Sequence, residues 1–140
     1  MMVFWGLFAC THEVEEEPVD YGLVACELFD QPLVEVQPSL DLEQAAQSVL
    51  VPSESQAWSV SNEADEGYLS IAVEEWMGTL YLVVNDGIEA EILELESSQL
   101  PNAIEGCKGY SLQTYSIHAW GTYVLHFQGV GNVELSVMHP

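Results

Sequence analysis

The chain has 140 residues, of which 49% are hydrophobic, so it is long enough for one core and too apolar for wholesale disorder. Its charge is strongly one-sided, with 23 acidic residues, a single basic residue, Lys108, and a formal net charge of −22. Such a surface repels phosphate groups, which excludes nucleic-acid binding and electrostatic attachment to anionic lipids.

The first predicted segment is an apolar run, residues 1–9, followed by Cys10. Its Leu-Phe-Ala-Cys ending resembles the lipobox of bacterial lipoprotein signals, with Leu7 three residues before the cysteine and Ala9 directly before it. The resemblance implies cleavage before Cys10 and lipidation of that residue, and Thr11 after it is similar to the outer-membrane version of the signal. The run is too short to span a bilayer as a helix. The alternative is an apolar N-terminal strand with an incidental cysteine.

An acidic tether is predicted at residues 10–20. Residues 11–20 hold four glutamates and a proline with almost no apolar content, so repulsion between like charges keeps this segment extended. A lipid-anchored domain needs such a spacer. We therefore expect an exported protein at the bacterial outer membrane, periplasm or cell surface, with its globular domain at residues 21–140.

Two short strands are expected at the start of this domain, at residues 21–29 and 33–36. The first would place Val24, Cys26 and Leu28 on one face, because successive side chains of a strand leave opposite sides of the sheet. Another strand is predicted at residues 56–61, with Trp58 and Val60 pointing inward.

Residues 39–51 leave two alternatives open. Asp41 could cap a short helix, with Gln44 three residues on completing the cap. An irregular loop leading to a strand at residues 48–51 fits the sequence equally well. The helix would bury a stripe made of Leu42, Ala45, Ala46 and Val49.

The region between residues 67 and 96 contains three runs of alternating apolar and polar residues, which is typical of strands with one buried face. A four-residue turn at 75–78 and a three-residue loop at 85–87 would join them into an antiparallel meander, since these lengths bring all apolar residues to one face. A bulge is expected between Ile92 and Leu93, where the alternation changes phase. The alternating apolar residues are Leu69, Ile71, Val73, Leu80, Leu82, Val84, Ile88, Ala90 and Ile92.

The C-terminal part predicts two further hairpins. Residues 97–108 form a long connection between sheets, and loops at 120–122 and 129–131 would each join two strands. The strands would bring Tyr115, Ile117 and Ala119 opposite Phe127, Leu125 and Tyr123, and these opposite Val133, Leu135 and Val137. About eight or nine short strands with close turns predict an all-β, antiparallel β-sandwich.

Four segments resemble bacterial pre-peptidase C-terminal domains. They are W-S-V-S-N at 58–62, L-S-I-A-V at 69–73, L-Y-L-V-V-N-D-G at 80–87 and G-T-Y-V-L-H-F at 121–127. Domains of that family are small secreted, jelly-roll-like sandwiches appended to exported enzymes, and they have no active site of their own. The resemblance therefore implies a jelly-roll-like sandwich, with Thr79 standing where the family has an aspartate.

The chain has three cysteines. If Cys10 carries lipid, Cys26 and Cys107 remain as a pair in an oxidising compartment, and we expect a disulfide between them. The alternative is two separate buried thiols that pack as small hydrophobic side chains.

Two groups of residues are candidates for ligand binding. Asn62, Glu63, Asp65 and Glu66 gather oxygen ligands in one turn, as a calcium site would, although a solvated turn is the simpler interpretation. Trp76, Met77 and Trp120 are predicted at turn tips, where they could stack on a sugar ring or contact a partner protein. The alternative for these three is that they fold back and close the end of the sandwich.

Catalysis has no support in the sequence. No nucleophile motif surrounds any serine, and His118 and His126, expected at diagonal positions on an outer face, follow no zinc spacing. We predict a non-enzymatic, lipid-anchored envelope protein with a structural or protein-interaction role, whose partner is an unidentified protein or glycan. The alternative is a carbohydrate- or calcium-binding module accessory to exported enzymes, with calcium as the one candidate cofactor.

Overall fold

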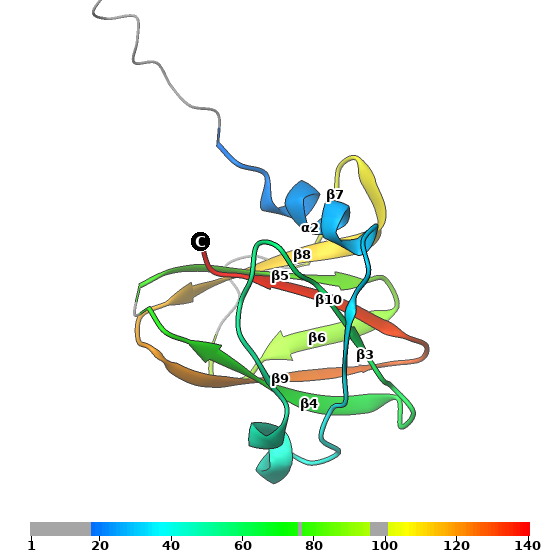
Figure 1. Ribbon diagram of the computed structural model, residues 1–140, viewed down its shortest axis with the longest axis vertical. Coiled ribbons are helices and arrows are strands. Elements are labelled where there is room, and N and C mark those ends of the chain that lie inside the picture. The colour runs from blue at the N-terminus through cyan, green and yellow to red at the C-terminus, as the bar shows by residue number, and fades with distance from the viewer. Residues whose placement is uncertain (1–17, 76, 96–100) are drawn as a thin grey trace, which may run out of the picture.

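The computed structural model describes residues 18–75, 77–95 and 101–140, which build a sandwich of two mixed β-sheets (Figure 1). The predicted all-β sandwich is confirmed. In chain order the elements are α2 (Tyr21–Phe29), β1 (Val34–Val36), η1 (Leu42–Gln47, a 3-10 helix), β2 (Val49–Leu50), β3 (Trp58–Val60), β4 (Glu66–Val73), β5 (Gly78–Asn85), β6 (Ile88–Ile92), β7 (Asn102–Ile104), β8 (Cys107–Ile117), β9 (Gly121–Gly129) and β10 (Val133–Met138).

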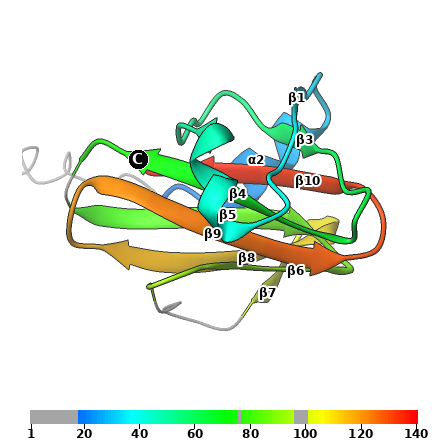
Figure 2. The same cartoon turned by 90° about the horizontal axis from the view of Figure 1, so that it is seen from below.

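Apart from β7 and β8, which are neighbours in the larger sheet, successive strands alternate between the two sheets. The larger sheet has the order β1-β3-β10-β5-β8-β7, and the smaller one has the order β2-β4-β9-β6. From β3 to β6, and again from β8 to β10, every connection crosses from one layer to the other, as in a jelly roll (Figure 2). The pairs β1–β3 and β2–β4 are parallel, and the remaining pairs are antiparallel.

The predicted meander is wrong. β4 pairs with β9, so that Leu69 lies opposite Leu125, and β5 pairs with β8 and β10. The two C-terminal hairpins are also wrong, because β9 pairs with β4 and β6 in the smaller sheet while β8 and β10 belong to the larger one. Alternation decides which way a side chain points but not which strand is its neighbour, and Val84 and Ile88 reach the same core from opposite sheets.

The faces predicted from alternation are nevertheless correct. Eight of the nine alternating apolar residues are buried between the sheets, and the ninth, Ala90, is partly buried against the same cluster. Trp58 and Val60 point into this core as expected. The remaining members of the cluster are Leu50, Tyr115, Ile117, Leu125, Phe127, Val133, Leu135 and Val137.

Residues 21–29 form the helix α2 and not the predicted strand. The carboxylate of Asp20 accepts a hydrogen bond from the backbone N–H of Leu23 at 3.2 Å, which caps the helix. Every third residue from Gly22 to Leu28 is buried, so the run contains a helical stripe in addition to its strand-like alternation. The helix covers the outer face of the larger sheet, where a second buried cluster consists of Ala25, Val83, Ile104 and Met138.

Both alternatives for residues 39–51 are partly realised. The Asp41 carboxylate accepts from the backbone N–H of Gln44 at 3.0 Å and caps η1, and β2 follows directly. η1 lies over the outer face of the smaller sheet, where Ser70 Oγ donates to the carbonyl of Ala45 at 2.9 Å. Of the predicted stripe only Ala45 is buried, whereas Leu42, Ala46 and Val49 are exposed.

The expected bulge after Ile92 is wrong, because β6 ends there and a turn follows, with Glu94 at φ 70°. Leu95 returns to the core after this turn. The next described strand, β7, belongs to the other sheet, so the chain crosses between sheets as predicted. The predicted connection at residues 97–108 is too long, because it contains β7 and the start of β8.

Candidate functional site

Two of the connections between the sheets run side by side at one end of the sandwich. The β4–β9 ladder ends with Val73 opposite Gly121, and the β5–β8 ladder ends with Gly78 opposite Ile117. The links β4–β5 and β8–β9 therefore cross the same end in opposite directions, next to the C-terminus (the left of Figures 1 and 2). We call this the open end and define it by residues 51–52, 74–75, 77, 118–120 and 139–140.

Large apolar side chains are exposed at the open end. Met77 is 69% exposed and Trp120 is 70% exposed, and Val51 nearby is 53% exposed. Both turn-tip predictions therefore have the right position, and for Met77 and Trp120 the alternative of folding back over the core is wrong. Trp76, the third predicted residue, lies outside the described residues.

A small hollow of about 120 Å³ lies at the open end, with Val51, Pro52, Glu74, Glu75 and His139 in its walls. The His139 ring donates from Nε2 to the carbonyl oxygen of Met77 at 3.2 Å, which holds the C-terminal segment against the β4–β5 link. The open end thus combines exposed apolar surface, an aromatic ring and two carboxylates. Such a set of groups suits a ligand that carries positive charge next to apolar groups.

The opposite end of the sandwich is held by side chain–backbone hydrogen bonds. Asn62 Nδ2 donates to the carbonyls of Gly129 and Gly131, at 2.9 and 2.8 Å. Asn85 Nδ2 donates to the carbonyl of Asn132 at 2.8 Å, and its Oδ1 accepts from the backbone N–H of Glu134 at 2.9 Å. We call this the tied end, defined by residues 61–65, 85–87, 105–110 and 129–132.

The predicted calcium turn lies at the tied end, and the side chains of Asn62 and Glu66 are directed to different partners. The Asn62 amide is used on the β9–β10 loop, and Glu66 contacts His126. Over residues 18–75, 77–95 and 101–140, no three histidine, cysteine, aspartate or glutamate side chains are placed to hold a metal ion. Glu63 and Asp65 are exposed, as a solvated turn requires.

His118 and His126 do not share a sheet face. His118 follows the end of β8 in the larger sheet, and His126 lies within β9 of the smaller sheet. His126 sits on the outer face of the smaller sheet, with Nε2 at 2.7 Å from Glu66 and Nδ1 at 3.9 Å from Glu91. Its ring stacks on Tyr68, with the ring centroids 4.7 Å apart. These contacts link the side chains of β4, β9 and β6 and fix the ring in place.

A buried polar group on β8 was missed by the sequence analysis. Gln113 Nε2 donates to the carbonyl of Ala90, at 2.9 Å, and the Tyr115 hydroxyl donates to Gln113 Oε1 and accepts from the backbone N–H of Ile92. Burial raises the pKa of Tyr115, which therefore stays neutral and can donate. The signal in the sequence was a glutamine at an inward position of an alternating strand.

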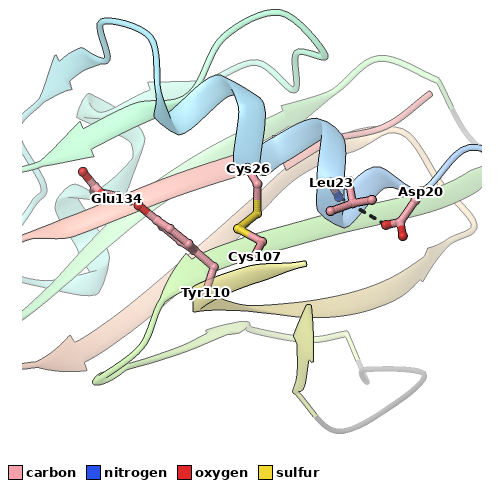
Figure 3. The surroundings of a disulfide bond; sticks show 6 residues. All are labelled: Asp20, Leu23, Cys26, Cys107, Tyr110 and Glu134. Carbon is pink, nitrogen blue, oxygen red and sulfur yellow. Dashed lines mark hydrogen bonds between the residues drawn. A yellow bond between two sulfur atoms is a disulfide. The ribbon is translucent and has the colours of Figure 1, made fainter. Parts of the chain in front are cut away.

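The predicted disulfide between Cys26 and Cys107 is present, with 6.3 Å between the two Cα atoms, and joins α2 to the start of β8 (Figure 3). Next to it, Tyr110 stacks on Phe29 with 4.3 Å between ring centroids, and its hydroxyl donates to the carboxylate of Glu134. Burial and the bond to Glu134 raise the pKa of Tyr110 above its ordinary value. The third cysteine, Cys10, lies outside the described residues.

Neither a protein-family model nor a curated protein sequence matches this chain. The helices in the described part of the chain are too short or too polar to cross a bilayer. A functional conclusion must therefore come from the chemistry of the residues described above.

Proposed function

We propose that the chain is an exported, lipid-anchored protein of the bacterial envelope that acts without catalysis, by binding a protein partner. The observation that carries this proposal is the Cys26–Cys107 disulfide, which accounts for two of the three cysteines and leaves Cys10 for lipid. Disulfides persist in oxidising compartments and are rare in the cytosol. The disulfide therefore supports export, and export is what the lipobox-like ending at Cys10 implies.

The open end supports the binding role. Exposed aromatic and methionine side chains are enriched where proteins contact partners, and Trp120 and Met77 sit on neighbouring links at one end of a well-packed sandwich. The outer faces of the two sheets are partly covered by α2 and η1, as seen above and below the layers in Figure 1. The open end therefore presents an exposed indole ring and an exposed thioether side chain on neighbouring links.

A carbohydrate-binding module accessory to exported enzymes is the second candidate. It is favoured by the exposure of Trp120, because an indole ring that is 70% exposed can stack on the apolar face of a sugar. A glycan array probed with the full chain and with Trp120→Ala separates the two candidates. Sugar binding that is lost in the variant would favour the module and argue against a protein partner.

The proposed lipid anchor is tested by mass spectrometry of the chain expressed in a bacterial host and recovered from the membrane fraction. We expect a mature N-terminus at Cys10, with the mass of a diacylglyceryl thioether and an acylated amine. Cys10→Ser should lose this mass and leave the membrane fraction, while Thr11→Ser, a matched neighbouring change, should keep both. Recovery of the unmodified chain with Met1 intact would overturn the proposed anchor.

A further inference from the structure

We infer that the open end recognises a cationic protein segment in which arginine side chains alternate with apolar ones. This inference rests on the binding role proposed above, but it does not depend on the lipid anchor. It specifies the chemistry of the partner, which the proposed function leaves open.

The apolar part of the surface comes from three separate segments. Val73 and Gly121 form the last β4–β9 pair. Glu74 directly follows Val73 and Trp120 directly precedes Gly121, so a carboxylate and the indole ring belong to neighbouring links. Met77 and Val51 contribute exposed aliphatic surface, and Val51 lines the hollow together with Glu74. Because Gly121 pairs with Val73, which lines the hollow, an extended segment laid across this end would pass both the Trp120 link and the hollow.

The charge at this end selects a cation. Glu74 and Glu75 line the hollow, and the ring of His139, which shares it, is engaged with the carbonyl of Met77. The chain's single basic residue, Lys108, lies near the start of β8 at the tied end, so no lysine or arginine neutralises the two carboxylates. A guanidinium group can stack on an indole ring and pair with a carboxylate at the same time, which an ammonium group does less well.

The net charge argues against the other occupants. Two copies of a chain with a net charge of −22 repel each other, which disfavours self-association through this end. A neutral sugar gains nothing from the field of the molecule, whereas a basic segment is attracted and steered by it. The field therefore favours a basic protein segment over a second copy or a glycan.

The test is a titration of the full chain carrying Cys10→Ser, which removes the lipid and keeps the chain in solution. The probe is a synthetic twelve-residue peptide that alternates arginine and leucine, and its matched control replaces each arginine by citrulline, which has nearly the same shape and no charge. Affinity is measured by calorimetry, and the binding site is located by amide chemical-shift changes in NMR. We expect saturable binding of the arginine peptide, shift changes centred on residues 74–75, 77 and 118–121, and affinity for the citrulline peptide lower by about tenfold or more.

Variants separate specific recognition from general attraction. Trp120→Ala and the pair Glu74→Gln/Glu75→Gln should each weaken binding about tenfold, with unchanged melting temperatures because these side chains are exposed. The pair Glu63→Gln/Glu105→Gln removes the same charge from the tied end and should weaken binding less than about twofold.

The inference is overturned if the two glutamate pairs have equal effects, if the citrulline peptide binds equally well, or if the arginine peptide does not bind. None of these results concerns the lipid at Cys10, so the proposed lipid anchor would stand. Sugar binding lost in Trp120→Ala, in place of peptide binding, would instead remove the protein-binding role itself.

Discussion

The two ends of the sandwich are built from the same strands but differ in their hydrogen bonds and in the exposure of their side chains. At the tied end, Asn62 and Asn85 make hydrogen bonds from their side chains to the loop that joins β9 to β10. At the open end, His139 donates to the carbonyl of Met77 and the backbone N–H of Ser53 donates to the carbonyl of Val137, while Trp120 projects into solvent. One end holds the crossings of the jelly roll in register, and the other leaves large side chains available.

The strand β9 shows this difference within nine residues, because a glycine with positive φ stands at each of its ends. A Cβ atom on Gly129 would lie 2.4 Å from the carbonyl oxygen of Gly87, whereas a Cβ on Gly121 would meet nothing within 4 Å. The comparison indicates that stability is concentrated at the tied end. It also predicts that changes at the open end alter binding while the fold persists.

The largest expected effect comes from the disulfide, which joins α2 to the tied end at Cys107. Cys26→Ser/Cys107→Ser should lower the free energy of unfolding by about 4 kcal/mol, because the bond links residues 81 positions apart and restricts the unfolded chain. Urea denaturation measures this change, and the unsubstituted chain under reducing conditions is the control. An unchanged midpoint in both samples would show that the disulfide does not contribute to stability.

The next prediction compares the two glycines of β9 directly. Gly129→Ala should cost about 3 kcal/mol, because the new methyl group collides with the backbone of Gly87 at a φ of 147°. Gly121→Ala, at a φ of 153° in open space, should cost only about 1 kcal/mol of backbone strain. Thermal or urea unfolding gives both values, and equal losses would mean that the two ends do not differ.

A smaller effect is expected from Asn62→Ala. The variant leaves the carbonyls of Gly129 and Gly131 without their donor and should lower the free energy of unfolding by about 1–2 kcal/mol. His139→Ala removes the hydrogen bond to the carbonyl of Met77 at the open end and should cost roughly 0.5 kcal/mol. The contrast fails if His139→Ala is the more damaging of the two.

A last effect, no larger than that of Asn62→Ala, is a loss of stability in alkaline solution, from Tyr110 at the tied end. Its pKa is raised in the folded chain above the ordinary value of 10.0, so the unfolded chain releases this proton first. The contribution is complete below pH 10 and is lost as the pH rises beyond it, by about 1 kcal/mol near pH 10.5. Denaturation midpoints at pH 8 and pH 10.5 should differ more in the unsubstituted chain than in Tyr110→Phe, in which Tyr115 is retained.

The sequence predicted the faces of the strands well and their neighbours poorly. Leu69, Leu82 and Ile92 are buried as expected, since alternation is a local property that survives any pairing. The predicted hairpin registers follow from placing apolar residues opposite each other on one sheet. Residues that face each other across the core from opposite sheets satisfy the same requirement, so alternation alone cannot separate a meander from a jelly roll.

The helix and the site show the same limit. Residues 21–29 carry strand-like alternation together with a three-residue spacing, and the Asp20 cap was the local signal that favoured a helix. Trp120 and Met77 were correctly placed at turn tips because turn signals are local. That their two links lie next to each other depends on the β4–β9 and β5–β8 pairings, which no local pattern contains.

The hydrogen bonds that Gln113 and Tyr115 make to β6 also bear on behaviour at high concentration. β6 is the last strand of the smaller sheet, and an unprotected strand of this kind invites pairing with a foreign chain and growth into fibres. Here the carbonyl of Ala90 and the N–H of Ile92 are already occupied from inside the molecule. Together with mutual repulsion between acidic copies, this internal protection would let many molecules crowd onto a small area without aggregating.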